Sequence, residues 1–216
     1  MPAPALDPHA AQPVQHLGPS PTSAPLTILF IHGRGASAES ILSLYPELDA
    51  ADCAALAPQA AGHTWYPHSF LAPLEENQPY LGSALAKIDA IVTGLLAQKI
   101  PPQRIVLLGF SQGACLASEF VARNPRPYAA LLALTGGLAG PPGTAYTYPG
   151  SLAGTRVLLA SGDPDPHVPF ARVQQTANVL TTMGATVDLH RYPNRPHTIS
   201  QDELTACGEI LQQLRS

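Results

Sequence analysis

Six short apolar segments recur along the chain after its first 25 residues, separated by longer stretches of mixed polarity. They are LTILFIHG (26–33), CAALAP (53–58), RIVLLGF (104–110), AALLAL (129–134), TRVLLASG (155–162) and TVDLHRY (186–192). Runs of this length, stopped by glycine or proline, are typical of strands buried in a parallel sheet. The pattern therefore predicts six strands.

The stretches between these runs have the spacing of amphipathic helices. Apolar residues recur at steps of three and four at Leu81, Leu85, Ile88, Val92 and Leu95, and less strongly at Val173, Ala177 and Leu180. The last stripe follows a capping-box pair and comprises Leu204, Cys207, Leu211 and Leu214. Strands alternating with helices predict an α/β protein with a mostly parallel central sheet and helices on both faces.

The first 25 residues have a different composition. They are rich in Pro and Ala, contain PHAAQP and GPSPTSAP, and show no apolar periodicity. Repeated prolines remove backbone donors that a helix or strand would need. We expect residues 1–25 to lack ordered structure and residues 26–216 to form a single domain.

Composition excludes several classes of function. The chain has 216 residues, a formal charge of −4 and 12% charged residues, and no cluster of Lys or Arg that would attract nucleic acid. No apolar run approaches the roughly 18 residues of a membrane span. Cys53, Cys115 and Cys207 have neither a disulfide nor a metal-ligand spacing, and no basic residue precedes Arg34 as a secretory signal would require. We expect a cytoplasmic protein with reduced, structural cysteines. Composition leaves open whether it forms a homo-oligomer.

The sequence GFSQG, residues 109–113, joins a predicted strand directly to a helical pattern that begins beyond Gly113. At such a junction G-x-S-x-G is typical of a nucleophile elbow, in which Ser111 is exposed at the carboxyl end of the sheet. Flanking glycines let the neighbouring backbone approach closely. The alternative is a glycine-rich turn in which Ser111 only caps the helix. We predict that Ser111 is a catalytic nucleophile.

A serine nucleophile needs a base and an acid that orients the base. Asp163 and Asp165 follow the predicted strand 155–162, and His197 follows the strand 186–192. The resulting chain order of Ser, Asp and His is that of the α/β-hydrolases. We expect Asp163 to cap its turn, and Asp165, which stands between two prolines, to point toward His197.

The loop FIHGRGAS, residues 30–37, supplies the second part of an oxyanion hole. Such a hole normally combines the N–H after the nucleophile with an N–H from a loop after an early strand. The backbone N–H groups of Gln112 and Arg34 are the candidates, with His32 and Gly33 shaping the turn. The Arg34 side chain is as consistent with a solvent position as with a substrate contact.

These motifs, together with LAPQA, TWYPHSFLAP, LGFSQGACLA and SGDPDPHVP, resemble the phospholipase/carboxylesterase family of α/β-hydrolases, which includes acyl-protein thioesterases. The resemblance runs from Leu26 to the C-terminus. It implies hydrolysis of small-molecule carboxylic esters or thioesters by Ser111, Asp165 and His197, without a metal or cofactor. The chain departs from the family before Leu26, which predicts a sheet shortened at its N-terminal edge. It also departs at Arg34, which favours small or short-acyl substrates.

Aromatic residues in GHTWYPHSFLAPL are candidates for an acyl pocket: Trp65, Tyr66 and Phe70. Packing of this loop on the sheet would explain them equally well. Four other histidines, His63, His68, His167 and His190, have no clear metal-ligand spacing to a carboxylate, so we expect no metal site.

Two other functions are compatible with such a fold. Dienelactone-hydrolase-like enzymes, which cleave cyclic esters, have a similar fold. They carry a cysteine at the elbow, however, where this chain has Ser111. A non-catalytic binding protein would lack a member of the Ser-Asp-His set, and all are present in the sequence. The site residues therefore favour a serine hydrolase.

Overall fold

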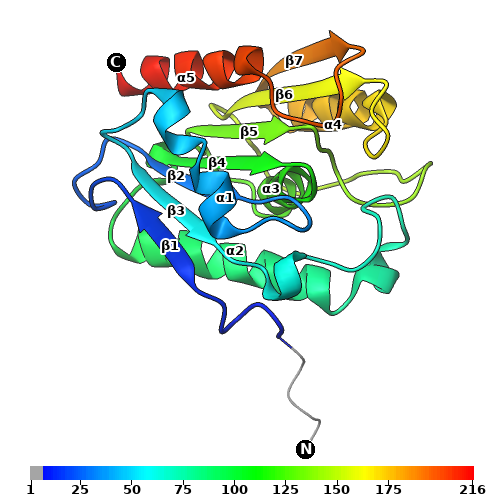
Figure 1. Ribbon diagram of the computed structural model, residues 1–216, viewed down its shortest axis with the longest axis horizontal. Coiled ribbons are helices and arrows are strands. Elements are labelled where there is room, and N and C mark those ends of the chain that lie inside the picture. Colours follow the sequence, from blue (N-terminus) through cyan, green and yellow to red (C-terminus); the bar gives the residue numbers. More distant parts are fainter. Residues whose placement is uncertain (1–6) are drawn as a thin grey trace, which may run out of the picture.

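The six predicted strands and one additional edge strand form a seven-stranded sheet. The computed structural model describes residues 7–216. The strands are β1 (Val14–Leu17), β2 (Thr27–Ile31), β3 (Ala54–Pro58), β4 (Ile105–Phe110), β5 (Ala130–Leu134), β6 (Arg156–Asp163) and β7 (Thr186–Pro193). Their order is β1-β3-β2-β4-β5-β6-β7, and only β1 runs antiparallel to its neighbour (Figure 1). The predicted α/β fold with a mostly parallel sheet is confirmed.

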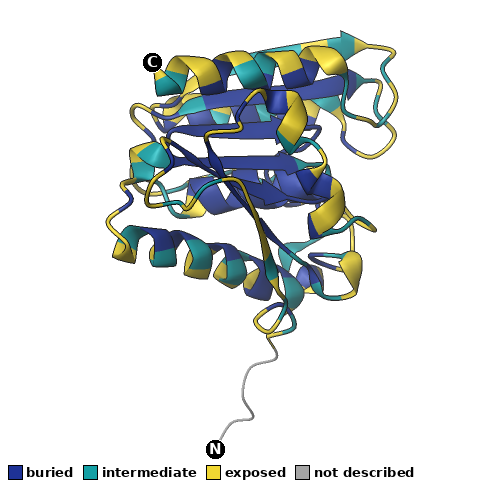
Figure 2. Cartoon of the chain, turned by 60° about the vertical axis from the view of Figure 1, so that its left-hand side comes forward, coloured by how far each residue is buried: buried dark blue, intermediate teal, exposed yellow. Residues whose placement is uncertain are grey.

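Helices cover both faces of this sheet. They are α1 (Ala38–Leu42), α2 (Tyr80–Ala97), α3 (Gln112–Arg123), α4 (Phe170–Thr182) and α5 (Gln201–Arg215). Alternate residues of β2 point to opposite faces: Ile28 and Phe30 pack with α1 and α5, whereas Leu29 and Ile31 pack with α2, α3 and α4. The strands are therefore buried on both sides, and the exposed faces of the helices point outward (Figure 2).

Four short 3₁₀ helices stand in the connections between these elements: η1 (Tyr45–Leu48), η2 (Ala61–His63), η3 (Leu74–Asn77) and η4 (Pro102–Arg104). Two of them, η2 and η3, lie in the long connection between β3 and α2. This connection forms one side of the cavity described below.

The segment before Leu26 is more ordered than its composition predicts. Residues 7–25 are described, and β1 pairs with β3 from Val14 opposite Pro58 to Leu17 opposite Ala55. Arg104 donates a hydrogen bond to the Pro25 carbonyl at 3.0 Å. β1 is largely exposed, so backbone pairing holds it without an apolar stripe. The expected lack of order is therefore wrong for residues 7–25, and for residues 1–6 it lies outside the described residues.

Helix α2 is long and apolar enough to cross a membrane by length and composition alone, with 18 residues and a mean hydropathy of 1.4. This was not expected from the sequence, where Ser, Lys, Asp and Thr interrupt the run of apolar residues. In the fold, Leu81, Ile88 and Val92 of α2 pack into the core beside the sheet. This is the position of a core helix.

Candidate active site

Ser111 occupies a strained turn between β4 and α3. Its φ and ψ angles are 55° and −120°, and its N–H donates to the Leu134 carbonyl at 3.0 Å. A Cβ atom on Gly109 would lie 2.4 Å from the Gly113 oxygen, and one on Gly113 would lie 2.0 Å from the Ile31 oxygen. Only glycine permits such close packing. The Ser111 side chain makes no capping hydrogen bond to α3, which excludes the helix-cap interpretation.

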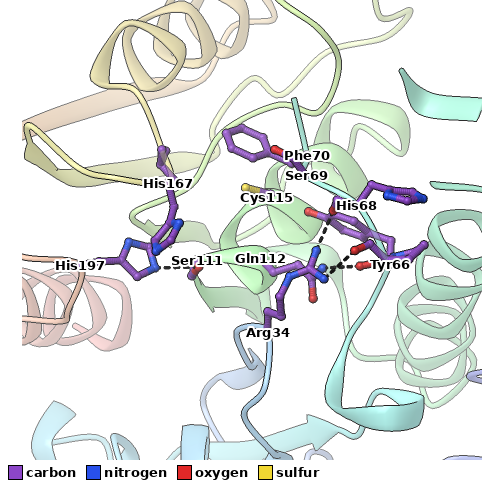
Figure 3. Close-up of a pocket in the computed structure, with 12 residues that line it drawn as sticks. Arg34, Tyr66, His68, Ser69, Phe70, Ser111, Gln112, Cys115, His167 and His197 are labelled. Carbon is purple, nitrogen blue, oxygen red and sulfur yellow. Dashed lines mark hydrogen bonds between the residues drawn. The ribbon is translucent and has the colours of Figure 1, made fainter. Parts of the chain in front are cut away.

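A chain of hydrogen bonds connects Ser111 to His197 and Asp165. His197 Nε2 lies 2.9 Å from Ser111 Oγ (Figure 3), and His197 Nδ1 lies 2.8 Å from Asp165 Oδ2. Because a carboxylate only accepts, Nδ1 is the donor and Nε2 is left to accept the serine proton. The other Asp165 oxygen accepts from the N–H groups of His167 and Val168 at 2.9 and 2.8 Å. Burial acts to raise the pKa of Asp165, but these hydrogen bonds outweigh it and lower that pKa.

Asp165 has a structural role that was expected of Asp163. Asp163 is the last residue of β6 and pairs with Arg191 on β7, while its own carbonyl accepts from Asn194 N–H at 2.9 Å. The side chain that caps the turn is that of Asp165. The expectation that Asp163 caps the turn is wrong, because the carboxylate two residues later reaches the free N–H groups ahead of it.

The loop that carries His197 is held by Arg195, whose side chain is only 9% exposed. Arg195 pairs with Glu203 at the start of α5, and also donates to Thr135 Oγ1 at 3.0 Å and to the Thr198 carbonyl at 2.7 Å. Glu203 is fully buried, and burial raises its pKa despite the hydrogen bonds of Ser200 and the charge of Arg195. The capping-box spacing revealed Glu203, but no local signal revealed its ion pair. Arg195 is thus a positioning residue that no sequence motif indicated.

The loop after β2 packs against the elbow. A Cβ atom on Gly33 would lie 3.3 Å from the Phe110 oxygen and 3.4 Å from Ser111 Cβ. His32 is buried: its Nδ1 donates to the Gly33 carbonyl at 2.8 Å, and its Nε2 accepts from Ala60 N–H at 3.1 Å. Burial lowers the pKa of His32, so the ring stays neutral in this arrangement.

The two predicted oxyanion donors are the backbone N–H groups of Arg34, in the loop after β2, and of Gln112, the residue after Ser111. Within residues 7–216, no acceptor contacts the backbone N–H of Arg34 or of Gln112, whereas the following N–H groups of Gly35 and Ala36 are bonded to carbonyls. An oxyanion hole requires two free donors beside a nucleophile, so this arrangement is compatible with the predicted one.

A cavity of about 420 Å³ adjoins Ser111 and His197. It is lined by Arg34, Tyr66, Pro67, His68, Ser69, Phe70, Ser111, Gln112, Cys115, His167, Val168 and His197, many of which appear in Figure 3. Two of the three candidate pocket aromatics, Tyr66 and Phe70, are on its wall. Trp65 is not: it is fully buried behind the wall and donates from Nε1 to the His32 carbonyl at 2.8 Å.

Side chains from distant elements hold the cavity wall formed by residues 60–70, which we call the pocket loop. Gln112 accepts from Trp65 N–H at 2.9 Å and donates from Nε2 to the Tyr66 carbonyl at 2.8 Å. Arg34 donates to the carbonyls of Pro67 and His68 at 2.8 and 2.6 Å. Neither side-chain role was visible in the sequence, whose motifs indicate only the backbone N–H groups of these two residues.

The N-terminal segment contributes to the same wall through His9. This buried residue accepts at Nδ1 from Ala61 N–H at 3.0 Å and donates from Nε2 to the Trp65 carbonyl at 2.9 Å. Its own N–H donates to Ser83 Oγ at 3.0 Å. Burial lowers the pKa of His9, which favours the neutral ring that this pair of bonds needs.

The cysteines are all buried and unpaired. Burial raises the pKa of Cys115 to about 12 and that of Cys53 to about 11, so neither is an activated thiolate. Cys115 borders the cavity one helical turn after Ser111, where its N–H donates to the Ser111 carbonyl at 3.0 Å.

The other histidines have separate places. His68 and His167 line the cavity, His63 Nδ1 lies 2.8 Å from the Ala36 carbonyl, and His190 is in β7. His167 stands edge-on to His197, with ring centroids 4.8 Å apart. Among the residues described, no three His, Cys, Asp or Glu side chains are grouped as metal ligands.

Solved structures resemble this fold. A crystal structure of a phospholipase/carboxylesterase from Dyadobacter fermentans is 42% identical, with a TM-score of 0.91, and the match covers 96% of this chain and 99% of that one. The carboxylesterase from Bacillus cereus has a TM-score of 0.75 at 20% identity, with 95% of each chain covered. At that identity the likeness shows the fold alone.

Relatives are also found by sequence. Acyl-protein thioesterase 1 of Mycosarcoma maydis is 31% identical over 133 residues, which are 60% of this chain and 55% of that protein. The chain thus matches little more than half the length of this relative. Carboxylesterase SOBER1 of Arabidopsis thaliana is 24% identical over 196 residues, which are 82% of this chain and 85% of that protein.

A family model described as phospholipase/carboxylesterase matches residues 19–215. This range contains the elbow, the Arg34 loop and the Asp165 and His197 loops. The resemblance inferred from the sequence is confirmed, and with it the enzyme class, a carboxylesterase-type hydrolase, at the level of the family. The chain belongs to the phospholipase/carboxylesterase family.

Proposed function

We propose that this protein hydrolyses carboxylic esters or thioesters through an acyl-enzyme on Ser111. The observation that carries the proposal is the continuous hydrogen-bond chain from Ser111 Oγ through His197 to Asp165, which opens on the cavity. Such a chain activates a weak serine nucleophile. The oxyanion would be bound by the N–H groups of Arg34 and Gln112.

The mechanism follows from these positions. His197 Nε2 takes the Ser111 proton as Oγ attacks the carbonyl carbon, and Asp165 stabilises the imidazolium that forms. The tetrahedral intermediate then expels the alcohol or thiol, which receives the proton from His197, and leaves an acyl group on Ser111. Water attacks the acyl-enzyme with His197 again as base, and the carboxylic acid departs. No step needs a metal or cofactor.

Small or short-acyl substrates suit the cavity best. It is enclosed on one side by Tyr66 and Phe70, and Arg34 brings a charge to its wall. A long alkyl chain would have to pass polar groups to remain bound, which costs desolvation free energy. We therefore propose that p-nitrophenyl acetate and butyrate are cleaved with a higher kcat/KM than the palmitate.

The alternatives gain no specific support. A dienelactone-hydrolase-like reaction would use a thiolate at the elbow, and the cysteine nearest to the elbow in sequence, Cys115, is buried with a raised pKa. A binding protein would have no use for the orientation of His197 by a buried carboxylate.

The proposal is tested with a fluorophosphonate probe, which labels activated serines, on the full chain. Wild type should be labelled and Ser111→Ala should not be. Ser69→Ala is the matched control, because Ser69 also lines the cavity, but its Oγ accepts from Leu71 N–H and is hydrogen-bonded to no histidine within residues 7–216. Equal labelling of wild type and Ser111→Ala, or loss of labelling only in Ser69→Ala, would contradict the assignment.

A further inference from the structure

The cavity beside Ser111 has an unbalanced charge. Arg34 is the only Lys or Arg among its lining residues, and none of them is an aspartate or glutamate. The nearby carboxylate of Asp165 is turned away, because its oxygens are occupied by His197 and by two backbone N–H groups. A ligand in the cavity therefore meets a permanent positive charge that no lining carboxylate offsets.

The Arg34 guanidinium is held in place but only partly bonded. Nη1 and Nη2 each donate to a carbonyl of the pocket loop, at Pro67 and His68 (Figure 3). A guanidinium has five N–H donors, so three have no partner within the described residues. None of the ion pairs in residues 7–216 includes Arg34.

A purely structural role does not use this charge. Two N–H donors of Arg34 fix the pocket loop through two carbonyl acceptors, and this role uses neither the other three donors nor the charge. A fixed guanidinium with free N–H groups is well suited to accept a carboxylate, because the side chain is already ordered before the substrate binds.

We infer that the preferred substrates are small esters or thioesters that carry a second, ionised carboxylate, which Arg34 binds while Ser111 attacks the scissile carbonyl. This inference rests on the proposed function and specifies its substrate class. The carboxylate could belong to the acyl part or to the alcohol part of the ester. The chemistry recognised by Arg34 is the same in both cases.

The first test compares charged and neutral esters of matched length. Monoethyl adipate against ethyl hexanoate examines the acyl part, and 3-acetoxypropanoate against propyl acetate examines the alcohol part. In at least one pair, wild type should have a kcat/KM about tenfold or more higher for the charged ester, as expected for a charge-assisted hydrogen bond. This ratio should fall as salt is raised from about 0.05 to about 0.5 M.

Variants of Arg34 are compared by the same ratio of kcat/KM values, charged ester over neutral ester. Any general loss of activity lowers both values and cancels in the ratio. Arg34→Gln should bring the ratio to about one, and Arg34→Lys should keep part of it. Arg126→Gln is the matched control, because it removes the same charge from an exposed site just before β5, at the amino ends of the strands, whereas the cavity lies beyond their carboxyl ends. It should leave the ratio unchanged. A ratio near one in wild type for both pairs, or an equal ratio in wild type and Arg34→Gln, would overturn the inference.

A binding measurement separates this inference from the proposed function. In calorimetric titrations, Ser111→Ala should bind monoethyl adipate or 3-acetoxypropanoate about tenfold more tightly than the Ser111→Ala/Arg34→Gln double variant does. If wild type cleaves neutral esters through Ser111 without this dependence, the proposed function stands and the inference fails. If neither ester type is cleaved but the Arg34-dependent binding is present, the proposed function fails and the carboxylate site stands.

Discussion

The two sides of the cavity are built by different physical means. On one side, Ser111, Asp165 and His197 follow the ends of β4, β6 and β7. In the sheet β6 and β7 are neighbours, and β5 alone separates β4 from β6. On the other side, the pocket loop belongs to a long connection with only short 3₁₀ helices. The first side is positioned by strand ends and charged groups, the second by hydrogen bonds to backbone groups from His9, Arg34 and Gln112.

The residues proposed to react and the residues that shape the cavity are therefore held by different contacts. The Asp165–His197 hydrogen bond and the Arg195–Glu203 ion pair hold the proposed catalytic groups, and these residues lie in the loops after β6 and β7 and in the first turn of α5. The pocket loop is instead held by side chains that bond to its backbone groups, as His9 does to the Trp65 carbonyl. We expect changes on the first side to affect the rate of the reaction most, and changes on the second side to affect stability and substrate choice.

The largest expected effect is that of Asp165→Asn. Asparagine keeps the size of the side chain but favours the wrong tautomer of His197, an exchange that lowers kcat about 10⁴-fold in the Ser-His-Asp proteases. We expect a fall in kcat of about 10³- to 10⁴-fold, measured on p-nitrophenyl butyrate, while circular dichroism shows a folded chain. Retention of more than about a tenth of wild-type kcat would mean that Asp165 does not orient the base.

A smaller effect is expected from the ion pair behind the histidine loop. Glu203→Ala leaves Arg195 charged in a site where its side chain is only 9% exposed. Removing one partner of a buried pair costs about 3 to 5 kcal/mol. Urea denaturation should show a loss of about 3 kcal/mol or more, with no comparable loss in Glu209→Ala, a change at an exposed position of the same helix. Equal stability of the two variants would place the support of this loop elsewhere.

On the pocket side, we expect His9→Ala to lower stability by about 1 to 3 kcal/mol, because Ala61 N–H and the Trp65 carbonyl lose their partner. His16→Ala, at an exposed position in β1, serves as control and should be nearly neutral. Fluorophosphonate labelling of Ser111 should persist in both variants. Loss of labelling in His9→Ala would show that the two sides of the cavity are not separable.

The same histidine gives this comparison a pH dependence. Burial lowers the pKa of His9 in the folded chain below its unfolded value of 6.5. Its stabilising contribution is therefore complete above about pH 7 and is lost as pH falls below that value. The difference in unfolding free energy between wild type and His9→Ala should shrink from about pH 7.5 to about pH 5. A difference that grows on acidification would show that the charged ring is the stabilising form.

The smallest effect is expected for Asp163→Asn. Asp163 pairs with Arg191, and the two side chains are 24% and 61% exposed. An exposed ion pair of this kind contributes less than about 1 kcal/mol. We expect kcat within about twofold of wild type and a small loss in thermal stability. If this variant is inactive and Asp165→Asn is active, the acid of the triad has been misassigned.

Local sequence patterns were enough to predict strands β2 to β7, their alternation with helices and the positions of Ser111, Asp165 and His197 at the ends of three strands. A buried strand has a run of apolar residues, and parallel strands place the residues that follow them at one edge of the sheet. The cytoplasmic location stays a prediction.

Four features became visible only in the folded chain. They are the ordered structure of residues 7–25, the turn-capping role of Asp165, the burial of Trp65, and the hydrogen bonds made by the side chains of His9, Arg34, Gln112 and Arg195. β1 forms because β3 offers a free edge, and a proline-rich segment has no apolar pattern to reveal it. Most of these hydrogen bonds join residues that are far apart in sequence. Each satisfies a backbone or carboxylate group that comes within reach only once the loops have packed together. A hydrogen bond between such groups has no periodicity along the chain, so the sequence pattern cannot contain it.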